Sequence, residues 1–184
     1  VALARGIVMQ PKVLLLDEPL SAIDAKLRKS LQTSIRRIHK NLGLTSVFVT
    51  HDQDEAMVMS DVIHLFHDGK IEQSGSPVEV YTKPVTPFAA GFIGSYNILD
   101  AAAMKRMTNR DWQGGQVAIR PETFFLSKDQ ITTEDYCMEG TITDSVPRGN
   151  VLRYSVNVND VEVYADVLFR SASIYDIGDK IHIG

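Results

Sequence analysis

The chain has 184 residues, of which 44% are hydrophobic and 23% are charged, and its formal net charge is −4 at pH 7. This composition is typical of a soluble globular protein with one large domain or two small ones. The acidic balance argues against a nucleic-acid-binding surface, which depends on clustered lysine and arginine. No apolar run approaches the roughly 18 to 20 residues of a membrane-spanning helix, so we expect any membrane association to involve a partner.

The first predicted elements are a helix and a buried strand. Residues Val1 to Met9 have helical character, which Pro11 ends, and the apolar run Val13 to Leu16 then predicts a strand covered on both faces, as in a parallel sheet. Asp17 and Glu18 follow directly. Such a pair is often only a cap or a loop acid. At the carboxyl end of a parallel strand, however, two carboxylates can divide the work of phosphoryl transfer, one serving Mg²⁺ and the other polarising water.

A long amphipathic helix is predicted next, with Asp24 as its N-cap and an end near Asn41, before Gly43. The predicted apolar face consists of Leu27, Leu31, Ile35, Ile38 and Leu42. The basic residues of the helix, among them Arg28 and Arg36, are interpreted as a solvated face, because lysine and arginine are ordinary surface residues.

A second apolar strand, Ser46 to Thr50, leads into His51. Asp52 and Glu55 form a D-x-x-E variant of the capping box, which predicts a short helix to about Met59. His51 is therefore expected at a strand-to-helix corner, near the two carboxylates that follow the first strand.

Four stretches in the first 83 residues resemble, in order and spacing, the ATP-binding cassette (ABC) ATPases. VLLLDEP looks like their Walker B strand, SAID like the D-loop, VTHDQDEA like the switch-histidine loop, and VALARGIVMQP like the helix after the LSGGQ signature. By this resemblance Asp17 serves the Mg²⁺ site, Glu18 is the general base and His51 contacts the γ-phosphate of ATP. The D-loop, Ser21 to Asp24, would communicate across a dimer that sandwiches the nucleotides, so Ser21 and Asp24 are candidate nucleotide-site residues.

The sequence contains neither G-x-x-x-x-G-K-[ST] nor LSGGQ; its only Gly-Lys pair, Gly69-Lys70, is followed by isoleucine. We therefore expect a C-terminal fragment of a longer ATPase, inactive alone, in which residues 1–86 are the end of a RecA-like α/β nucleotide-binding domain. Within it, Asp68-Gly69 predicts a hairpin, and Ser76-Pro77 with Glu79 predicts a helix start.

From Phe88 the pattern changes. PFAAGFIGSYNIL resembles the segment that joins the ATPase to a regulatory domain in ABC importers, so 87–95 is predicted as a linker. Residues 96–184 hold short β-rich runs, which favour an all-β, OB-like domain. The IRPE sequence at 119–122 looks like an element of the transport-associated OB-like (TOBE) domain. The expected strands are 117–119, 123–126, 138–146, 151–158, 161–167 and 180–183, with helical character at 101–103.

The resemblance implies the ATP-hydrolysing subunit of an ABC importer for sugars, polyamines, ferric iron or related solutes. Its expected cofactors are ATP and Mg²⁺. Its expected partners are transmembrane permease subunits, a solute-binding protein and a second nucleotide-binding subunit, with no nucleic acid. It is expected to lie peripherally on the cytoplasmic face of the cell membrane. Two alternatives are an ABC ATPase outside transport, and a module whose β domain only senses ligands or acts as a scaffold.

Overall fold

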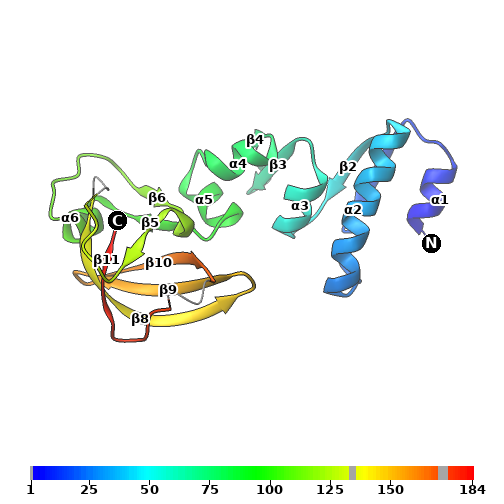
Figure 1. Ribbon diagram of the computed structural model, residues 1–184. Coiled ribbons are helices and arrows are strands. Elements are labelled where there is room, and N and C mark those ends of the chain that lie inside the picture. Colours follow the sequence, from blue (N-terminus) through cyan, green and yellow to red (C-terminus); the bar gives the residue numbers. More distant parts are fainter. Residues whose placement is uncertain (1, 133–135, 170–173) are drawn as a thin grey trace. The chain divides into compact units, whose positions relative to one another are not determined.

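The computed structural model describes residues 2–132, 136–169 and 174–184 (Figure 1). The chain divides into two compact units, Val1–Pro84 and Val85–Gly184. The predicted functional division into 1–86, a linker at 87–95, and 96–184 remains a prediction.

The first unit is built on two parallel strands. Helix α1 (Ala2–Val8) precedes β1 (Val13–Asp17), and helix α2 (Ala25–Leu42) connects β1 to β2 (Thr45–Val49). The register pairs Val13 with Thr45 and Asp17 with Val49, so the two strands end together. A helical crossover is what a parallel pair requires, because a short hairpin cannot return the chain to the same end. The segments that follow the two strands therefore start at the same edge.

The strand prediction for 13–16 is confirmed, but in this chain the strand lacks the cover on both faces that its apolar sequence favours. Side chains alternate along β1 and β2, and the ones on one face are open: Val13 is 52% exposed, Leu15 73%, Val47 53% and Val49 54%. Because successive strand side chains point to opposite faces, these exposed residues form one continuous apolar surface.

Helix α2 begins and ends as its sequence predicts. The Asp24 carboxylate accepts the Leu27 amide, and Gly43 adopts φ +61°, the left-handed conformation that glycine tolerates best. The prediction of which face is buried is wrong, however: Leu27 is 50% exposed and Leu42 53%, whereas Gln32 is only 5% exposed. Helix α2 packs against α3 (Gln53–Met59), and polar side chains of α2 take part in this contact.

The rest of the first unit agrees with its turn and cap signals. Strands β3 (Ile63–His67) and β4 (Lys70–Gly75) form an antiparallel hairpin through Asp68 and Gly69, both with positive φ. Helix α4 (Pro77–Thr82) starts with a complete capping box between Ser76 and Glu79.

The second unit contains a five-stranded antiparallel sheet in the order β10-β9-β8-β11-β7. Its three long strands, β8, β9 and β10, run side by side in Figure 1. The sheet strands are β7 (Leu126–Ser127), β8 (Met138–Arg148), β9 (Val151–Val158), β10 (Val161–Leu168) and β11 (Lys180–Ile183); the other elements of the unit are α5 (Pro87–Ile93), α6 (Ala101–Thr108), η1 (Pro121–Thr123) and the antiparallel pair β5 (Asn97–Leu99) and β6 (Val117–Ile119). The expected strand at 123–126 is wrong except at its last residue, because a 3₁₀ turn occupies 121–123.

The core of this unit lies against the sheet. Every second residue of β9 is buried, and Tyr154, Val156 and Val158 are each 0% exposed. Gly140 of β8 faces these residues, and a Cβ placed there would lie 2.6 Å from Val156 Cγ1. The buried Asn97 side chain accepts the Tyr164 amide at 2.7 Å and donates to the Tyr164 carbonyl at 2.9 Å. A satisfied buried amide fixes where β5 meets β10, because an unpaired one would be costly.

Candidate active site

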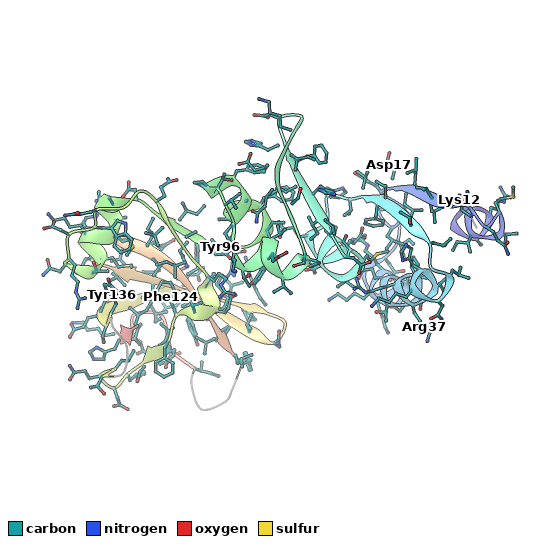
Figure 2. The ribbon with its side chains drawn as sticks, turned by 90° about the horizontal axis from the view of Figure 1, so that it is seen from above. Lys12, Asp17, Arg37, Tyr96, Phe124 and Tyr136 are labelled. Carbon is teal, nitrogen blue, oxygen red and sulfur yellow. The ribbon has the colours of Figure 1, made fainter. Side chains whose placement is uncertain are left out.

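The candidate site lies where the two parallel strands of the first unit end. Figure 2 labels Asp17, the last residue of β1, whose side chain is exposed. The amide of Glu18 donates to the Val49 carbonyl at 2.9 Å, which extends the parallel pairing by one residue. This hydrogen bond brings the two carboxylates beside the segment Thr50 to Asp52, which follows β2.

Glu18 and His51 meet across this edge. Nδ1 of His51 lies 3.0 Å from Oε1 of Glu18, and the two side chains are 74% and 46% exposed. The hydrogen bond to Glu18, followed by the negative charge of that carboxylate, raises the pKa of His51 above its ordinary value of 6.5; Asp52 and Glu55 add to the effect. A carboxylate paired with a histidine at an open strand end is suited to moving a proton.

The backbone at Glu18 is unusual, with φ +41°. A non-glycine residue in the left-handed region is strained and typically costs about 1 to 3 kcal/mol, so the surrounding structure has to hold it there. The Ser21 hydroxyl and amide both donate to the Glu18 carbonyl, at 2.9 and 3.2 Å, and the side chain of Leu20 is 2% exposed. The buried leucine and the serine hydrogen bonds therefore hold the turn that aims Glu18.

The other predicted site residues have clear positions but are not all joined to this pair. The hydrogen bonds of Ser21 to Glu18 go to the backbone carbonyl of Glu18 and not to its carboxylate. Asp24 is the N-cap of α2, where its Oδ1 accepts the Leu27 amide at 3.0 Å. The structure thus brings Glu18, His51 and Ser21 together, and it gives Asp24 a capping contact.

A polar network surrounds the backbone on both sides of His51. The Thr50 hydroxyl accepts the Asp52 amide at 3.0 Å and donates to Glu55 Oε2 at 2.9 Å. Asp52 Oδ1 in turn accepts the Glu55 amide at 3.1 Å and so caps α3. Glu55 is only 2% exposed. Only half of the predicted capping box is present: Asp52 caps the Glu55 amide, but the Asp52 amide donates to the Thr50 hydroxyl instead of to the Glu55 side chain, and these bonds fix both neighbours of His51.

Arg28 and Arg36 of α2 contact this helix, which corrects their interpretation as solvated residues. Arg28 Nη1 donates to Asp52 Oδ2 at 3.3 Å, at the start of α3. Arg36 Nη1 donates to the Ser60 carbonyl at 3.3 Å, at the other end. The two arginines are eight residues apart, about 12 Å along a helix, which suits the length of α3. The positive charges by themselves do not predict this role. The sequence signal that could have found it is the spacing of Arg28, Gln32 and Arg36, which are four residues apart and therefore lie on one face of α2.

The exposed carboxylate at the end of β1 fits a magnesium ion whose other ligands are oxygens of substrate phosphates and water. Among the described residues, no three His, Cys, Asp or Glu side chains form a group able to hold a metal by themselves. Mg²⁺ commonly uses only one or two protein carboxylates together with phosphate oxygens and water. Asp17, exposed at the strand end, is a carboxylate that could serve as one such ligand.

Comparison with known proteins adds family evidence for both units. A family model described as "TOBE domain" matches residues 117–184. The chain is 42% identical over 187 residues to "Spermidine/putrescine import ATP-binding protein PotA" of Bacillus thuringiensis (strain Al Hakam), covering 100% of this chain and 54% of the relative. It is 41% identical over 174 residues to the protein of the same name from Clostridioides difficile (strain 630), covering 87% and 48%.

A third relative is the "Uncharacterized ABC transporter ATP-binding protein YdcT" of Escherichia coli (strain K12), 41% identical over 162 residues, with 88% of this chain and 46% of the relative covered. The chain thus spans about half the length of the curated relatives it matches. Over most of its length the chain is homologous to the ATP-binding subunits of ABC importers, and residues 117–184 form a TOBE domain.

Proposed function

We propose that this chain is part of the ATP-hydrolysing subunit of an ABC importer, and that Glu18 and His51 belong to its catalytic centre. The observation that carries the proposal is the 3.0 Å contact between these side chains at the ends of adjacent parallel strands. In this proposal the first unit is part of a RecA-like nucleotide-binding domain. The second unit is an OB-like regulatory domain.

Glu18 acts as the general base. Its carboxylate accepts a proton from the water that attacks the γ-phosphate of ATP, and the left-handed turn at Glu18 directs it out of the strand end. His51 holds Glu18 in place and contacts the γ-phosphate, where a protonated imidazole stabilises the negative charge of the phosphate oxygens. Asp17 would hold Mg²⁺, which when bound offsets charge on the phosphates. Ser21 and Asp24 lie on the loop that would face a second nucleotide-binding subunit in a dimer.

The proposed partners are transmembrane permease subunits and a solute-binding protein, with the subunit lying peripherally on the cytoplasmic face of the membrane. Within residues 2–132, 136–169 and 174–184, no helix is long and apolar enough to cross a bilayer. A polyamine is the proposed solute, a choice that rests on the names of the relatives. Uptake of labelled spermidine by cells with and without the full-length gene tests it.

The test of catalysis is Glu18→Gln in the full-length subunit that contains this sequence. The amide keeps the shape of the side chain but cannot take up a proton, so hydrolysis should fall at least about a hundredfold, the range expected for loss of a general base. Binding of Mg-ATP should persist. His51→Ala should also reduce turnover without unfolding the protein.

The matched control is Glu72→Gln, on the β4 hairpin of the same unit, which should leave turnover within about twofold of the unmodified protein. Near-normal hydrolysis by Glu18→Gln would exclude Glu18 as the base. A loss of Mg-ATP binding equal to the loss of turnover would exclude the proposed chemical role as well.

A further inference from the structure

We propose that Arg28 is a positioning residue for ATP hydrolysis, linking the loop after β1 to the His51 corner through one guanidinium group. This inference rests on the proposed ATPase function. It concerns a residue of α2 that lies outside the Glu18–His51 pair and that acts through the backbone around it.

One side of the link is the loop that contains the predicted D-loop. Arg28 Nη2 donates to the Ile23 carbonyl at 2.8 Å. Ile23 is in turn tied to the preceding turn, because its amide donates to the Leu20 carbonyl at 3.1 Å. Leu20 follows Glu18 by two residues and is buried. The guanidinium therefore holds the end of the same loop whose start positions the Glu18 carboxylate.

The other side is the start of α3, directly after His51. Arg28 Nη1 donates to Asp52 Oδ2 at 3.3 Å, while Asp52 Oδ1 caps the helix at the Glu55 amide. The Asp52 carboxylate is thus used twice, once by α3 and once by α2. Because Asp52 is the neighbour of His51, any shift of Arg28 moves the backbone that carries the imidazole.

Charge and burial explain why this residue is an arginine. The Glu55 side chain is 3% exposed, and Arg28 Nε lies 3.8 Å from its Oε1. Arg28 Nε is buried and has no hydrogen-bond partner among the described residues, so it faces the carboxylate as a charge. A planar guanidinium serves the Ile23 carbonyl and the two carboxylates in fixed directions at once, whereas a lysine ammonium is a single point charge on a flexible stem.

The consequence for function is a coupling between two parts of the site. Glu18 comes from the β1 side and His51 from the β2 side, and their contact depends on the distance between the two loops. Arg28, on α2, sets that distance because its guanidinium is hydrogen-bonded to both loops. A displacement of about 1 Å in a reacting group can cost a hundredfold in rate, so loosening this link should slow chemistry more than substrate binding.

The experiment compares Arg28→Lys with Arg37→Lys in the full-length subunit. Both changes keep the positive charge. Arg37 is exposed, and Figure 2 shows it on α2 well away from Asp17. Arg28→Lys should lower kcat for Mg-ATP hydrolysis by about tenfold to a hundredfold, with KM changed less than about twofold, while Arg37→Lys should leave both within about twofold. Equal kcat values for the two variants, or a rise in KM alone, would overturn the role of Arg28.

A second readout uses the protein without nucleotide. The charged groups that act on His51 are Glu18 at the end of β1, Asp52 at the N-cap of α3 and Glu55 of α3, and Arg28 of α2 pairs with Asp52. In Arg28→Lys the pKa of His51, followed by NMR, should fall toward 6.5, since the Glu18 contact loosens. Lysine keeps the charge, so the fall reports geometry. An unchanged titration curve would contradict the link.

Asp52→Asn is the companion variant, because asparagine still caps α3 but loses the ion pair with Arg28. It should reproduce the loss of kcat, and the double variant Arg28→Lys with Asp52→Asn should be no slower than either single one by more than about twofold. Fully multiplicative effects would overturn the link. Glu18→Gln in the same assay separates the two proposals. If it abolishes turnover while Arg28→Lys does not reduce it, only the inference on Arg28 fails; if Glu18→Gln turns over normally, the proposed function fails and the role of Arg28 fails with it.

Discussion

The imidazole of His51 and the carboxylate of Glu18, 33 residues apart in sequence, are within hydrogen-bonding distance at 3.0 Å. Each side chain follows a different strand, and the parallel register of β1 and β2 is what brings them together. This contact makes the protonation state of His51 a direct report on the site.

The first prediction concerns pH. Because Glu18 raises the pKa of His51 above 6.5, the contact stabilises the folded protein most when His51 is protonated. That contribution is fully present below the ordinary histidine pKa and is lost as pH rises through the raised value in the folded protein. Glu18→Gln should lower the pKa of His51 toward 6.5, measured by NMR titration. A titration curve identical to that of the unmodified protein would show that the pair is not formed in solution.

The second prediction concerns the stability of the β-rich unit. Arg153 of β9 makes two hydrogen bonds of 2.7 Å to Asp166 of β10, and the two side chains are 12% and 14% exposed. Replacing Asp166 with alanine leaves the guanidinium largely buried and unpaired, so we expect a loss of about 2 to 3 kcal/mol in the free energy of unfolding, measured with urea.

The matched control for this change is Asp111→Ala. Asp111 pairs with Lys105 at 2.6 Å, but its side chain is 80% exposed. Solvent screens such a pair, and the urea midpoint should barely move. Similar shifts for Asp166→Ala and Asp111→Ala would mean that burial of the Arg153 pair does not govern its contribution.

The third prediction concerns nucleotide affinity of the 184-residue chain on its own. The sequence contains no glycine-rich phosphate cradle with its lysine, and such backbone nests supply much of the binding energy for phosphates. Calorimetric titration with Mg-ATP should therefore detect neither micromolar binding nor turnover. A clear micromolar isotherm would show that residues of this chain bind the phosphates without such a cradle.

The fourth prediction concerns association. The face formed by Val13, Leu15, Val47 and Val49 is more than half exposed at every position, and exposed apolar faces and open strand edges promote pairing. Light scattering of the chain should report a dimer or larger, unless the first unit is less ordered than the second. Leu15→Lys should shift the population toward monomer. Ile177→Lys, at a site 66% exposed in the other unit, should not. A monodisperse, well-ordered monomer with the unmodified sequence would contradict this.

Local structure was largely readable from the sequence. The cap residues Asp24, Asp52 and Ser76 each accept an amide three residues on, as their short polar side chains favour. The Asp68-Gly69 hairpin and the alternating strand at 151–158 are likewise where their patterns place them. These features depend on a few neighbouring residues, so the sequence of those residues is sufficient to specify them.

Long-range relationships were decided only by the tertiary structure. In the helical pattern Arg28 and Arg36 look like ordinary surface charges. In the structure, however, Arg28 pairs with the Asp52 carboxylate that caps the start of α3, and Arg36 donates to the Ser60 carbonyl at its end. The exposure of Leu27 and Leu42, and the burial of Gln32 on the same helix, follow from which element packs against which face. Periodicity identifies the faces of a helix, but the neighbour that covers each face is fixed by chain segments distant in sequence, and a local pattern carries no information about them.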